Sequence, residues 1–566
     1  RPPRSTLFPY TTLFRSVNVV AEVKRAIKYT EDKEYAKAQR IYQDILKIDK
    51  NNSIVLSCLG LLYLNTKFFK HAERKLEQAE KIKPNLVTEE GLGLVKYYLG
   101  KYTEACNYFS KVIKYTKNFD VFDKYTKSLS ELRMSSLEYM VASECIKRYP
   151  LKKESLCNMV MACIATGRLN DAVGFAEQVV KSFPKYGDAW IKFGLVNEMV
   201  YRNEEMAQAC YKKALSCGDK QAAYYNLAIN AHKRDDFKTA EYYAKKLIKF
   251  DSENSVINFL YATICFKQRK FKKAYKYYIK KDFDKQYTEH PISKLKRFWD
   301  GKTYKDETLL VYCDQGIGDY MMFVRYLPLL TKKFKKIKLC TLKPVLNLFK
   351  RSFAMYKNIE VVERRERFPH YDKSLILSNI PYFLNSDIDK IPMSSGYLIA
   401  DENKIEDYKE KYFNNTNKLK VGICWEAGSA GWREQINRTL NISLFDSILN
   451  KKDIQFYSLQ VKPSLDNYKQ YSGMIDLGKT FNDFDDTAAA IKNLDVVITV
   501  DTSVAHLAGA MGVNTFMLLP YCPDWRWFDN DKHTEWYDSV KIFKQKDTVS
   551  WSDVIENINN ELSKLC

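Results

Sequence analysis

The sequence lacks the features of a membrane-spanning or a disulfide-rich protein. No window approaches the ~18 uncharged apolar residues that a transmembrane helix needs. Its 13 cysteines are an odd number and include no CxxC pair. This pattern argues against a disulfide scaffold or a zinc ribbon and favours a reducing compartment. We therefore expect a cytoplasmic protein, and peripheral attachment at an inner membrane stays open.

Arginine is scarce among the basic residues. Of 91 Lys and Arg only 21 are Arg, and the formal net charge is +22. A chain rich in Lys and Tyr is what AT-rich codon usage produces, so we expect no specific nucleic-acid partner. Residues 418–566 hold 16 basic and 20 acidic side chains, so residues 1–417 carry +26. That part of the chain is suited to acidic proteins or an anionic membrane surface.

The length of 566 residues predicts two or three domains, and 46% apolar with 28% charged residues is typical of a globular protein. The first residues differ in composition from the rest of the chain. Residues 6–16 (TLFPYTTLFRS) resemble a translated sequencing-adapter oligonucleotide. We expect residues 1–16 to be such an artefact, and a genuine N-terminal arm is the alternative.

Alanine recurs with a period of 33 to 35 residues in two series through the N-terminal half. The recurring residues are Ala38, Ala72 and Ala105, then Ala172, Ala207, Ala240 and Ala274. An aromatic residue or Leu stands three positions before most of them, and Pro84 and Pro184 each follow their Ala by twelve. Residues 116–150 have no clear Ala register, so the unit there stays uncertain.

This period resembles the tetratricopeptide repeat, a helix–turn–helix of about 34 residues in which a small Ala permits close packing. The resemblance predicts an α-solenoid over residues 17–281, with a concave groove for a protein or glycan acceptor. A spacer or oligomerisation arm is the alternative. The Asn ladder of repeat-containing N-acetylglucosamine transferases is absent, because Asn158 and Asn226 are accompanied by Cys58, Gly91 and Leu260.

The C-terminal half alternates strand-like and helix-like segments, which predicts parallel sheets in two Rossmann-like halves. The expected strands are residues 308–313, 337–342, 359–362, 375–377, 421–425, 454–460, 496–500 and 515–519. Helices are expected at residues 320–330, 487–492 and 505–510. The predicted boundaries are a linker over 282–305, a first half over 306–400, a connection over 401–418 and a second half over 419–566.

Two strand-to-helix junctions carry candidate site residues, since ligands of such folds bind beyond the carboxyl ends of strands. At the first, Gly316 and Gly318 would allow a sharp turn and the close approach of a ligand, and Asp319 begins a helix. An ordinary N-cap carboxylate is the alternative for Asp319.

The second junction runs from a buried strand into the residues Asp501, Thr502, Ser503 and His506. Free N–H groups at that helix start suit a phosphate, and Asp501 could accept hydrogen bonds from sugar hydroxyls. A capping cluster with His506 in the core is the alternative. No His or Cys cluster has metal-ligand spacing. We expect Asp483, Asp485 and Asp486 to cap a helix rather than to bind a metal.

Three segments together resemble the heptosyltransferase-like glycosyltransferases, and in particular bacterial proteins that fuse tetratricopeptide repeats to such a domain. The segments are residues 314–328 (DQGIGDYMMFVRYLP), 421–440 and 494–528. The resemblance implies a GT-B fold, with an acceptor-side half before a nucleotide-sugar half. It also implies metal-independent, inverting transfer of a sugar from a nucleotide-diphosphate donor, which is a co-substrate, so no cofactor is expected.

The same resemblance implies roles for individual residues. Asp319 matches the general base, and Arg438 matches a basic residue on the donor phosphates, where well-known members have Lys. Asp501, Thr502, Ser503 and His506 match the donor-binding turn, with Ser503 in place of a Gly. Trp425 either flanks the donor or lies in the core. Arg526 is typical of the repeat-fused group and has no assigned mechanism.

The sequence thus predicts a glycosyltransferase whose repeats recruit a protein or glycan acceptor. The alternative is a repeat-based interaction scaffold whose transferase-like domain is inactive.

Overall fold

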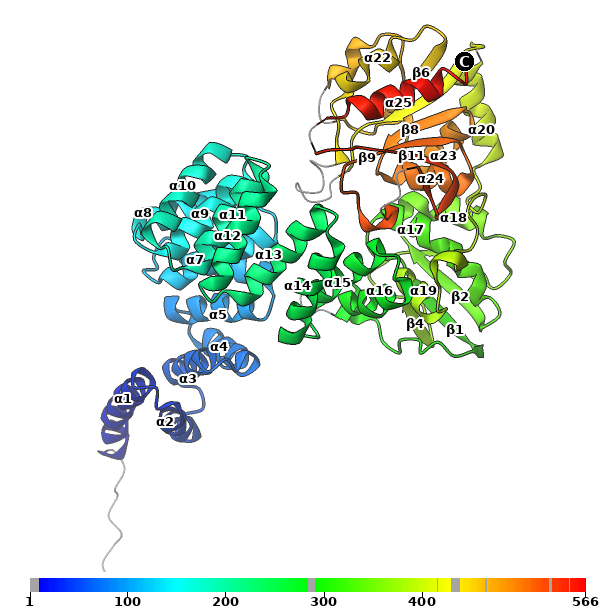
Figure 1. Cartoon of the computed structure of the whole chain (residues 1–566). Coiled ribbons are helices and arrows are strands. Elements are labelled where there is room, and N and C mark those ends of the chain that lie inside the picture. Colours follow the sequence, from blue (N-terminus) through cyan, green and yellow to red (C-terminus); the bar gives the residue numbers. More distant parts are fainter. Residues whose placement is uncertain are drawn as a thin grey trace, which may run out of the picture. The chain divides into compact units, whose positions relative to one another are not determined.

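The computed structural model describes residues 10–283, 291–414, 416–428, 438–463, 466–528, 532–548 and 550–566 (Figure 1). These residues form two compact units, of which the first ends at Asn226 and the second begins at Leu227. In the described part, the first unit is built from helices, and the second combines helices with two sheets.

The first unit is a series of helical pairs. Its helices are α1 (Tyr10–Glu31), α2 (Tyr35–Ile48), α3 (Ser53–Asn65), α4 (Phe69–Ile82), α5 (Leu86–Tyr98), α6 (Tyr102–Val112), α7 (Phe119–Glu131), α8 (Ser135–Arg148), α9 (Lys153–Ala165), α10 (Leu169–Ser182), α11 (Gly187–Met199), α12 (Glu204–Ser216) and the start of α13 (Lys220–Lys233). From α1 to α12 each helix packs against the next, and α3, α5, α7, α9 and α11 also pack in succession. This stacking of first helices makes the unit a tetratricopeptide-like solenoid.

The recurring alanines explain the close packing of the pairs. Each is the fourth residue of the second helix of its pair, and each is completely buried. A small side chain at that depth lets the paired helices approach closely. In the pair α7–α8 the equivalent fourth residue is Glu138, which is 2% exposed. The helical repeat over residues 116–150, which the sequence left uncertain, is therefore present as the pair α7–α8. Glu138 stands where the other repeats have the buried Ala.

The turn inside each pair has its own recurring feature, a residue in the left-handed backbone region. These residues are Lys33, Lys67, Gly100, Arg133, Gly167, Arg202, Asp235 and Arg269, with φ between 50° and 75°. Their spacing of 33 to 35 residues repeats that of the alanines, so turn and packing positions keep the same period. Helix α1 begins at Tyr10, before the boundary at residue 16 that the sequence predicts for native chain.

The last helical pairs belong to the second unit. They comprise the end of α13, α14 (Phe237–Phe250), α15 (Ser255–Lys267), α16 (Phe271–Tyr278) and the 3-10 helix Ile279–Phe283. The helical pairs thus continue past the division between compact units, which falls at 226/227. The reason is packing: Phe266 of α15 stacks on Trp525 at 4.3 Å between ring centroids, and Phe271 of α16 lies 5.2 Å from Phe528.

The second unit contains a four-stranded and a seven-stranded sheet. The strands are β1 (Tyr304–Tyr312), β2 (Phe334–Thr341), β3 (Ile359–Glu363), β4 (Lys373–Ile376), β5 (Leu419–Cys424), β6 (Ile454–Ser458), β7 (Ile475–Asp476), β8 (Val496–Val500), β9 (Thr515–Leu519), β10 (His533–Thr534) and β11 (Tyr537–Lys544). The orders are β3-β2-β1-β4 and β10-β11-β9-β8-β5-β6-β7, and all named pairs are parallel except β10 with β11. The eight strands predicted from the sequence are present, and the fold class is α/β.

Helices connect these strands and place the candidate residues at strand ends. They are α17 (Ile317–Phe323), α18 (Leu346–Ser352), α19 (Ile380–Phe383), α20 (Glu402–Tyr408), α22 (Asp446–Leu449), α23 (Phe484–Lys492), α24 (Ser503–Met511) and α25 (Ser552–Leu562). The helix expected at 320–330 is α-helical only to Phe323 and continues as a 3-10 helix over Val324–Leu330. Pro328 accounts for this, because it has no N–H for an i−4 bond.

The predicted connection over residues 401–418 contains α20 and a π-helical turn, Lys409–Phe413. Within the described ranges, no helix is both long enough and apolar enough to span a bilayer.

Candidate functional site

The first candidate turn follows β1 and leads into α17. The sequence assigned its sharp bend to the glycines, but the left-handed residue is Gln315 (φ 64°), and Gly316 has φ −87°. Gly318 serves close approach instead, since a Cβ there would lie 2.7 Å from Cδ2 of His506. The glycine thus lets α17 and α24 pack together, and the assignment of the bend to Gly316 was wrong.

Asp319 is the third residue of α17, and its two carboxylate oxygens have different partners. Oδ2 accepts a hydrogen bond from the N–H of Gly316, the N-cap residue, at 3.3 Å. Oδ1 accepts from Nε of Arg526 at 2.7 Å and also from its Nη2. The capping role considered from the sequence is therefore present, and an ion pair to a distant segment is added to it.

Arg526 is the centre of the cluster, although the sequence offered no mechanism for it. It lies in the 3-10 helix Trp525–Trp527, and its side chain is 14% exposed. Nη1 donates to Asp524 at 2.6 Å, and the guanidinium lies 4.7 Å from the ring centroid of Trp525. The backbone oxygen of Arg526 accepts from Nε1 of Trp536 at 2.6 Å. The sequence signal that could have identified Arg526 as a site residue is its position between two Trp in a chain with little Arg.

The same guanidinium leaves its two carboxylates with opposite pKa shifts. Burial raises the pKa of Asp319, and Arg526 opposes that rise without cancelling it. Burial would also raise the pKa of Asp524, but Arg526 outweighs it and holds that pKa below its usual value. Asp319 is therefore the better proton acceptor of the two, because a base with a raised pKa holds a proton more readily.

The second candidate turn joins β8 to α24. Asp501 follows the strand and is 4% exposed, and its Oδ2 lies 3.4 Å from Nη1 of Arg438. Burial raises the pKa of Asp501, and Arg438 opposes this. The hydroxyl of Thr502 accepts from the N–H of Val504 at 3.2 Å, so Thr502 caps α24, and half-buried Ser503 is its first residue. The turn is thus compatible with both interpretations of the sequence, the capping of α24 and an anion site at its first N–H groups.

His506 lies one turn further along α24 and is 4% exposed. Its Nδ1 is 2.8 Å from the hydroxyl of Tyr537, and its ring stacks on Trp527 at 5.0 Å between centroids. Burial lowers the pKa of His506 to about 3, so the ring is neutral at physiological pH. The geometry matches the alternative in which His506 packs in the core and forms the contact with Gly318.

Two further predictions concern residues away from this cluster. Trp425 is 1% exposed within the apolar cluster that includes Val421 and Ile423, so it is a core residue. Asp483 caps α23 by accepting from the N–H groups of residues 485 and 486 at 2.9 and 3.3 Å. Asp485 pairs with Arg351 at 2.7 Å, and Asp486 pairs with Lys404 at 2.6 Å. The expected capping role of Asp483 is present.

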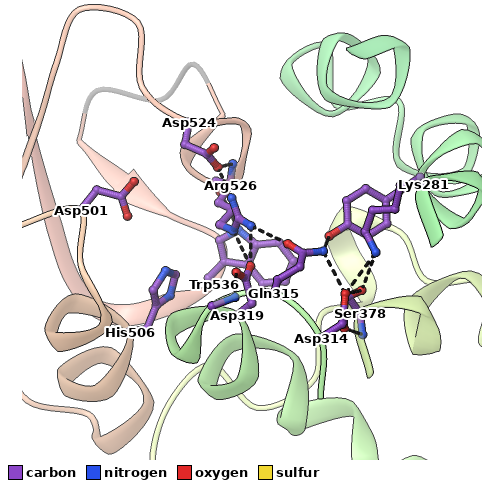
Figure 2. Close-up of polar contacts among 12 residues, drawn as sticks. Lys281, Asp314, Gln315, Asp319, Ser378, Asp501, His506, Asp524, Arg526 and Trp536 are labelled. Carbon is purple, nitrogen blue, oxygen red and sulfur yellow. Dashed lines mark hydrogen bonds and ion pairs between the residues drawn. The ribbon is translucent and has the colours of Figure 1, made fainter. Parts of the chain in front are cut away.

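The structure brings most of the predicted residues into one region. Asp319, Arg526, Asp501 and His506 appear around a common area in Figure 2, where α17 meets the start of α24. Arg526 also influences the pKa of Asp501. Among the residues that the structure describes, no group of three or more His, Cys, Asp or Glu side chains is placed to hold a metal ion.

Comparison with known proteins gives limited matches. No family model matches the chain. Over 292 residues the chain is 22% identical to the protein FlbA of Caulobacter vibrioides, which covers 47% of this chain and 48% of that protein. The chain therefore spans about half the length of the curated relative it matches.

The solved structures similar to part of this chain include repeat proteins. The protein YrrB, a TPR protein with an unusual peptide-binding site, covers 32% of this chain and 96% of its own (19% identity, TM-score 0.29). A tetratricopeptide repeat protein from Parabacteroides merdae covers 43% and 97% (11% identity, TM-score 0.38). The stacked helical pairs of this chain are themselves a scaffold suited to protein interaction.

Proposed function

We propose that the protein is a glycosyltransferase that moves a sugar from a nucleotide-diphosphate donor to a protein or glycan acceptor. The observation that carries this proposal is the Asp319 carboxylate, only 12% exposed and with a raised pKa, held by Arg526 beside the β8–α24 turn. A base and an anion-binding helix start at the carboxyl ends of parallel strands are what such a transfer requires. A GT-B arrangement of the two sheets is part of the proposal.

In the proposed reaction, Asp319 takes the proton of an acceptor hydroxyl while that oxygen attacks the anomeric carbon of the donor sugar. Oδ2 is the oxygen we assign to the proton, because Oδ1 already accepts both contacts from Arg526. The bond from the anomeric carbon to the diphosphate breaks, and attack from the opposite face inverts the configuration.

The diphosphate leaves toward the start of α24 and Arg438, where N–H groups and a cation stabilise its negative charge. The side chain of Arg438 is 25% exposed, so it can turn toward a ligand. We propose a metal-independent reaction, since this cation and the helix start supply the charge that a metal would otherwise supply. The DFDD carboxylates are engaged by α23, Arg351 and Lys404.

The donor site is tested by a thermal-shift panel with ADP, GDP, UDP, CDP and dTDP. A nucleotide at ~100 times its dissociation constant stabilises the folded state by ~2.7 kcal/mol. We expect one nucleotide to shift the wild type and to shift Asp501→Ala much less. Asp495→Ala is the matched control, since exposed Asp495 precedes the same strand at its other end. A shift that survives Asp501→Ala would contradict the proposed site.

The catalytic role is tested with the nucleotide sugar that the panel identifies. Asp319→Ala should keep the nucleotide shift and lose transfer, by ~10²–10⁴-fold for a removed general base. Undiminished transfer would rule Asp319 out as the base.

A second candidate function is an interaction scaffold with an inactive transferase-like domain, favoured by the long series of stacked helical pairs. Its signature is partner capture by the full chain that Asp501→Ala leaves unchanged, with no nucleotide shift in the wild type. A predicted contact with anionic membranes has its own test, co-sedimentation with vesicles of anionic or neutral lipid, and equal pelleting would dismiss it.

A further inference from the structure

We propose that Tyr278 and Lys281, at the end of the last repeat, are positioning residues for Asp319. They act through Gln315 and Arg526, which connect the repeat to the carboxylate (Figure 2). The kinetic part of this inference rests on the proposed transferase function, and its structural part does not. The last repeat then belongs to the candidate site as well as to the solenoid.

The side chain of Gln315 is the bridge between the two sides. Its Nε2 donates to the hydroxyl of Tyr278 at 2.6 Å, and its Oε1 accepts from Nη2 of Arg526 at 3.1 Å. A guanidinium can only donate, so the amide oxygen must face Arg526 and the NH₂ group must face Tyr278. The amide of Gln315 can therefore form both hydrogen bonds in one orientation only. A contact to either Arg526 or Tyr278 then sets which group of the amide faces the other residue.

The backbone at Gln315 adds to the argument. Its φ of 64° is in the left-handed region, which costs free energy for a residue with a side chain. Such a conformation persists where surrounding contacts over-determine it. The contacts from Tyr278 and Arg526 meet that condition, and Nε2 makes a further one to Oδ2 of Asp314 at 3.1 Å.

Lys281 fixes the residue that precedes this turn. Its Nζ lies 3.1 Å from Oδ2 of Asp314 and 3.1 Å from Oγ of Ser378, and 4.4 Å from the ring centroid of Tyr278. Ser378 also donates to Asp314 through its N–H and its hydroxyl, at 3.2 and 2.8 Å. Burial would raise the pKa of Asp314, but Lys281 and Ser378 hold it below the usual value. The carboxylate stays charged, and the turn is anchored to the repeat.

The last repeat, the helical pair α15–α16, also contacts the segment that carries Arg526. Phe266 stacks on Trp525, and Nζ of the buried Lys267 donates to the backbone oxygen of Phe528 at 2.5 Å. The last repeat thus contacts the chain on both sides of the Asp319–Arg526 ion pair. A displacement of this repeat would change the separation of the pair, and with it the proton affinity of Asp319.

The kinetic test compares two neighbouring tyrosines of α16. Tyr278→Phe removes the hydroxyl that holds Gln315 and keeps the ring. Tyr277→Phe is the matched control, because its ring packs edge-on against Tyr261 and it has no part in the bridge. We expect Tyr278→Phe to lower kcat about tenfold with KM unchanged, the effect of one lost positioning hydrogen bond. The acid limb of the pH profile should move to higher pH, since a looser Arg526 lowers the pKa of Asp319 less.

Lys281 gives a rescue experiment. Lys281→Met should show the same loss and pH displacement, and Lys281→Arg should restore most of the activity, because an arginine keeps the charge beside Asp314. A structural role alone would predict loss of folded protein rather than a displaced pH profile. Unchanged kcat and pH profile in Tyr278→Phe, with an active wild type, would overturn the proposal.

Hydrogen exchange of the full chain tests the positioning without any transfer assay. Tyr278→Phe should speed exchange in peptides covering residues 314–323 and 521–528, and Tyr277→Phe should leave both unchanged. Faster exchange in Tyr278→Phe with no transfer by the wild type would support the positioning and contradict the proposed function. Unchanged exchange would overturn the positioning even if the wild type is active.

Discussion

Each unit of the molecule places a largely enclosed cation among carboxylates, and the pKa shifts of the carboxylates differ between the two clusters. In the solenoid, Lys96 is 5% exposed and pairs with Glu73, Glu77 and Glu104 at 2.8, 2.9 and 2.6 Å. In the second unit, Arg526 is 14% exposed and pairs with Asp319 and Asp524. The ion-pair distances in the two clusters are alike. Distance alone therefore does not distinguish a carboxylate that only stabilises the fold from one that can act in a reaction.

Asp319 is the least exposed of these carboxylates, whereas Asp524, at 33%, resembles the glutamates around Lys96. The glutamates around Lys96 are 15% to 40% exposed, and two lysines hold the pKa of Glu73 below its usual value despite partial burial. Asp319 is shorter and only 12% exposed, and burial raises its pKa even beside Arg526. The comparison teaches that an ion pair leaves an acid reactive only where the cation fails to compensate fully for lost solvent.

Replacing Arg526 or Lys96 by an uncharged residue should give the largest difference in stability between the two clusters. We expect Arg526→Met to destabilise the second unit by up to ~3–5 kcal/mol, because the carboxylate of Asp319, only 12% exposed, loses its partner; Asp524 is 33% exposed and can be hydrated. Lys96→Met should cost ~1–2 kcal/mol, since its glutamates can turn toward water. Urea unfolding measures both: Trp190 is the one tryptophan before residue 227, so fluorescence follows mainly the second unit, and circular dichroism follows the helices.

Equal losses for these two variants would contradict the distinction drawn from exposure. The exposed pair Lys47–Asp44 is the control, since Lys47→Met should change the unfolding midpoint little.

Glu138 extends the comparison to an acid that forms no ion pair with any residue that the structure describes. Burial raises its pKa to about 7, above the unfolded value of ~4.5. Its contribution is therefore fully present below the unfolded pKa and is lost as pH rises through 7, by up to about 3 kcal/mol. We expect the helical melting temperature to fall between pH 5.5 and 8.5, and Glu138→Ala to abolish most of that fall. Glu144→Ala, at an exposed position of α8, should retain it.

The close approach at Gly318 gives a smaller expected effect than the loss of Arg526. Gly318→Ala forces a Cβ to within 2.7 Å of Cδ2 of His506, which should cost ~1–3 kcal/mol through overpacking. Gly316→Ala is the matched control on the same turn, because its nearest atom is Oδ2 of Asp319 at 3.5 Å and its φ is negative. Thermal melts of the two variants should therefore differ. Equal melting temperatures would show that α17 and α24 can move apart at no cost in stability.

The sequence predicted the elements whose signal is local. The alanine period gave the helical pairs, and the apolar runs gave eight strands, because parallel strands are buried on both faces. It missed β11, whose polar positions Asp538 and Lys541 interrupt the run. It also left α7–α8 uncertain, because Glu138 occupies the place of the small residue by which the repeat was detected.

The site could be predicted only as separate motifs. Asp319 and the Asp501 turn follow strands in an expected way, so local pattern placed them. The partner of Asp319 is 207 positions away, and the bridge through Gln315 depends on a glutamine, which no short motif distinguishes. Long-range hydrogen bonds of this kind leave no periodic trace in a single sequence.

The left-handed turns of the repeats have a consequence for thermal tolerance. Six of the eight turn positions carry a side chain where glycine would relieve strain. In a solenoid each repeat contributes nearly independently, so relief at several turns accumulates. Selection or design could therefore raise the heat resistance of this protein step by step at the exposed turn positions, which exclude the half-buried Asp235.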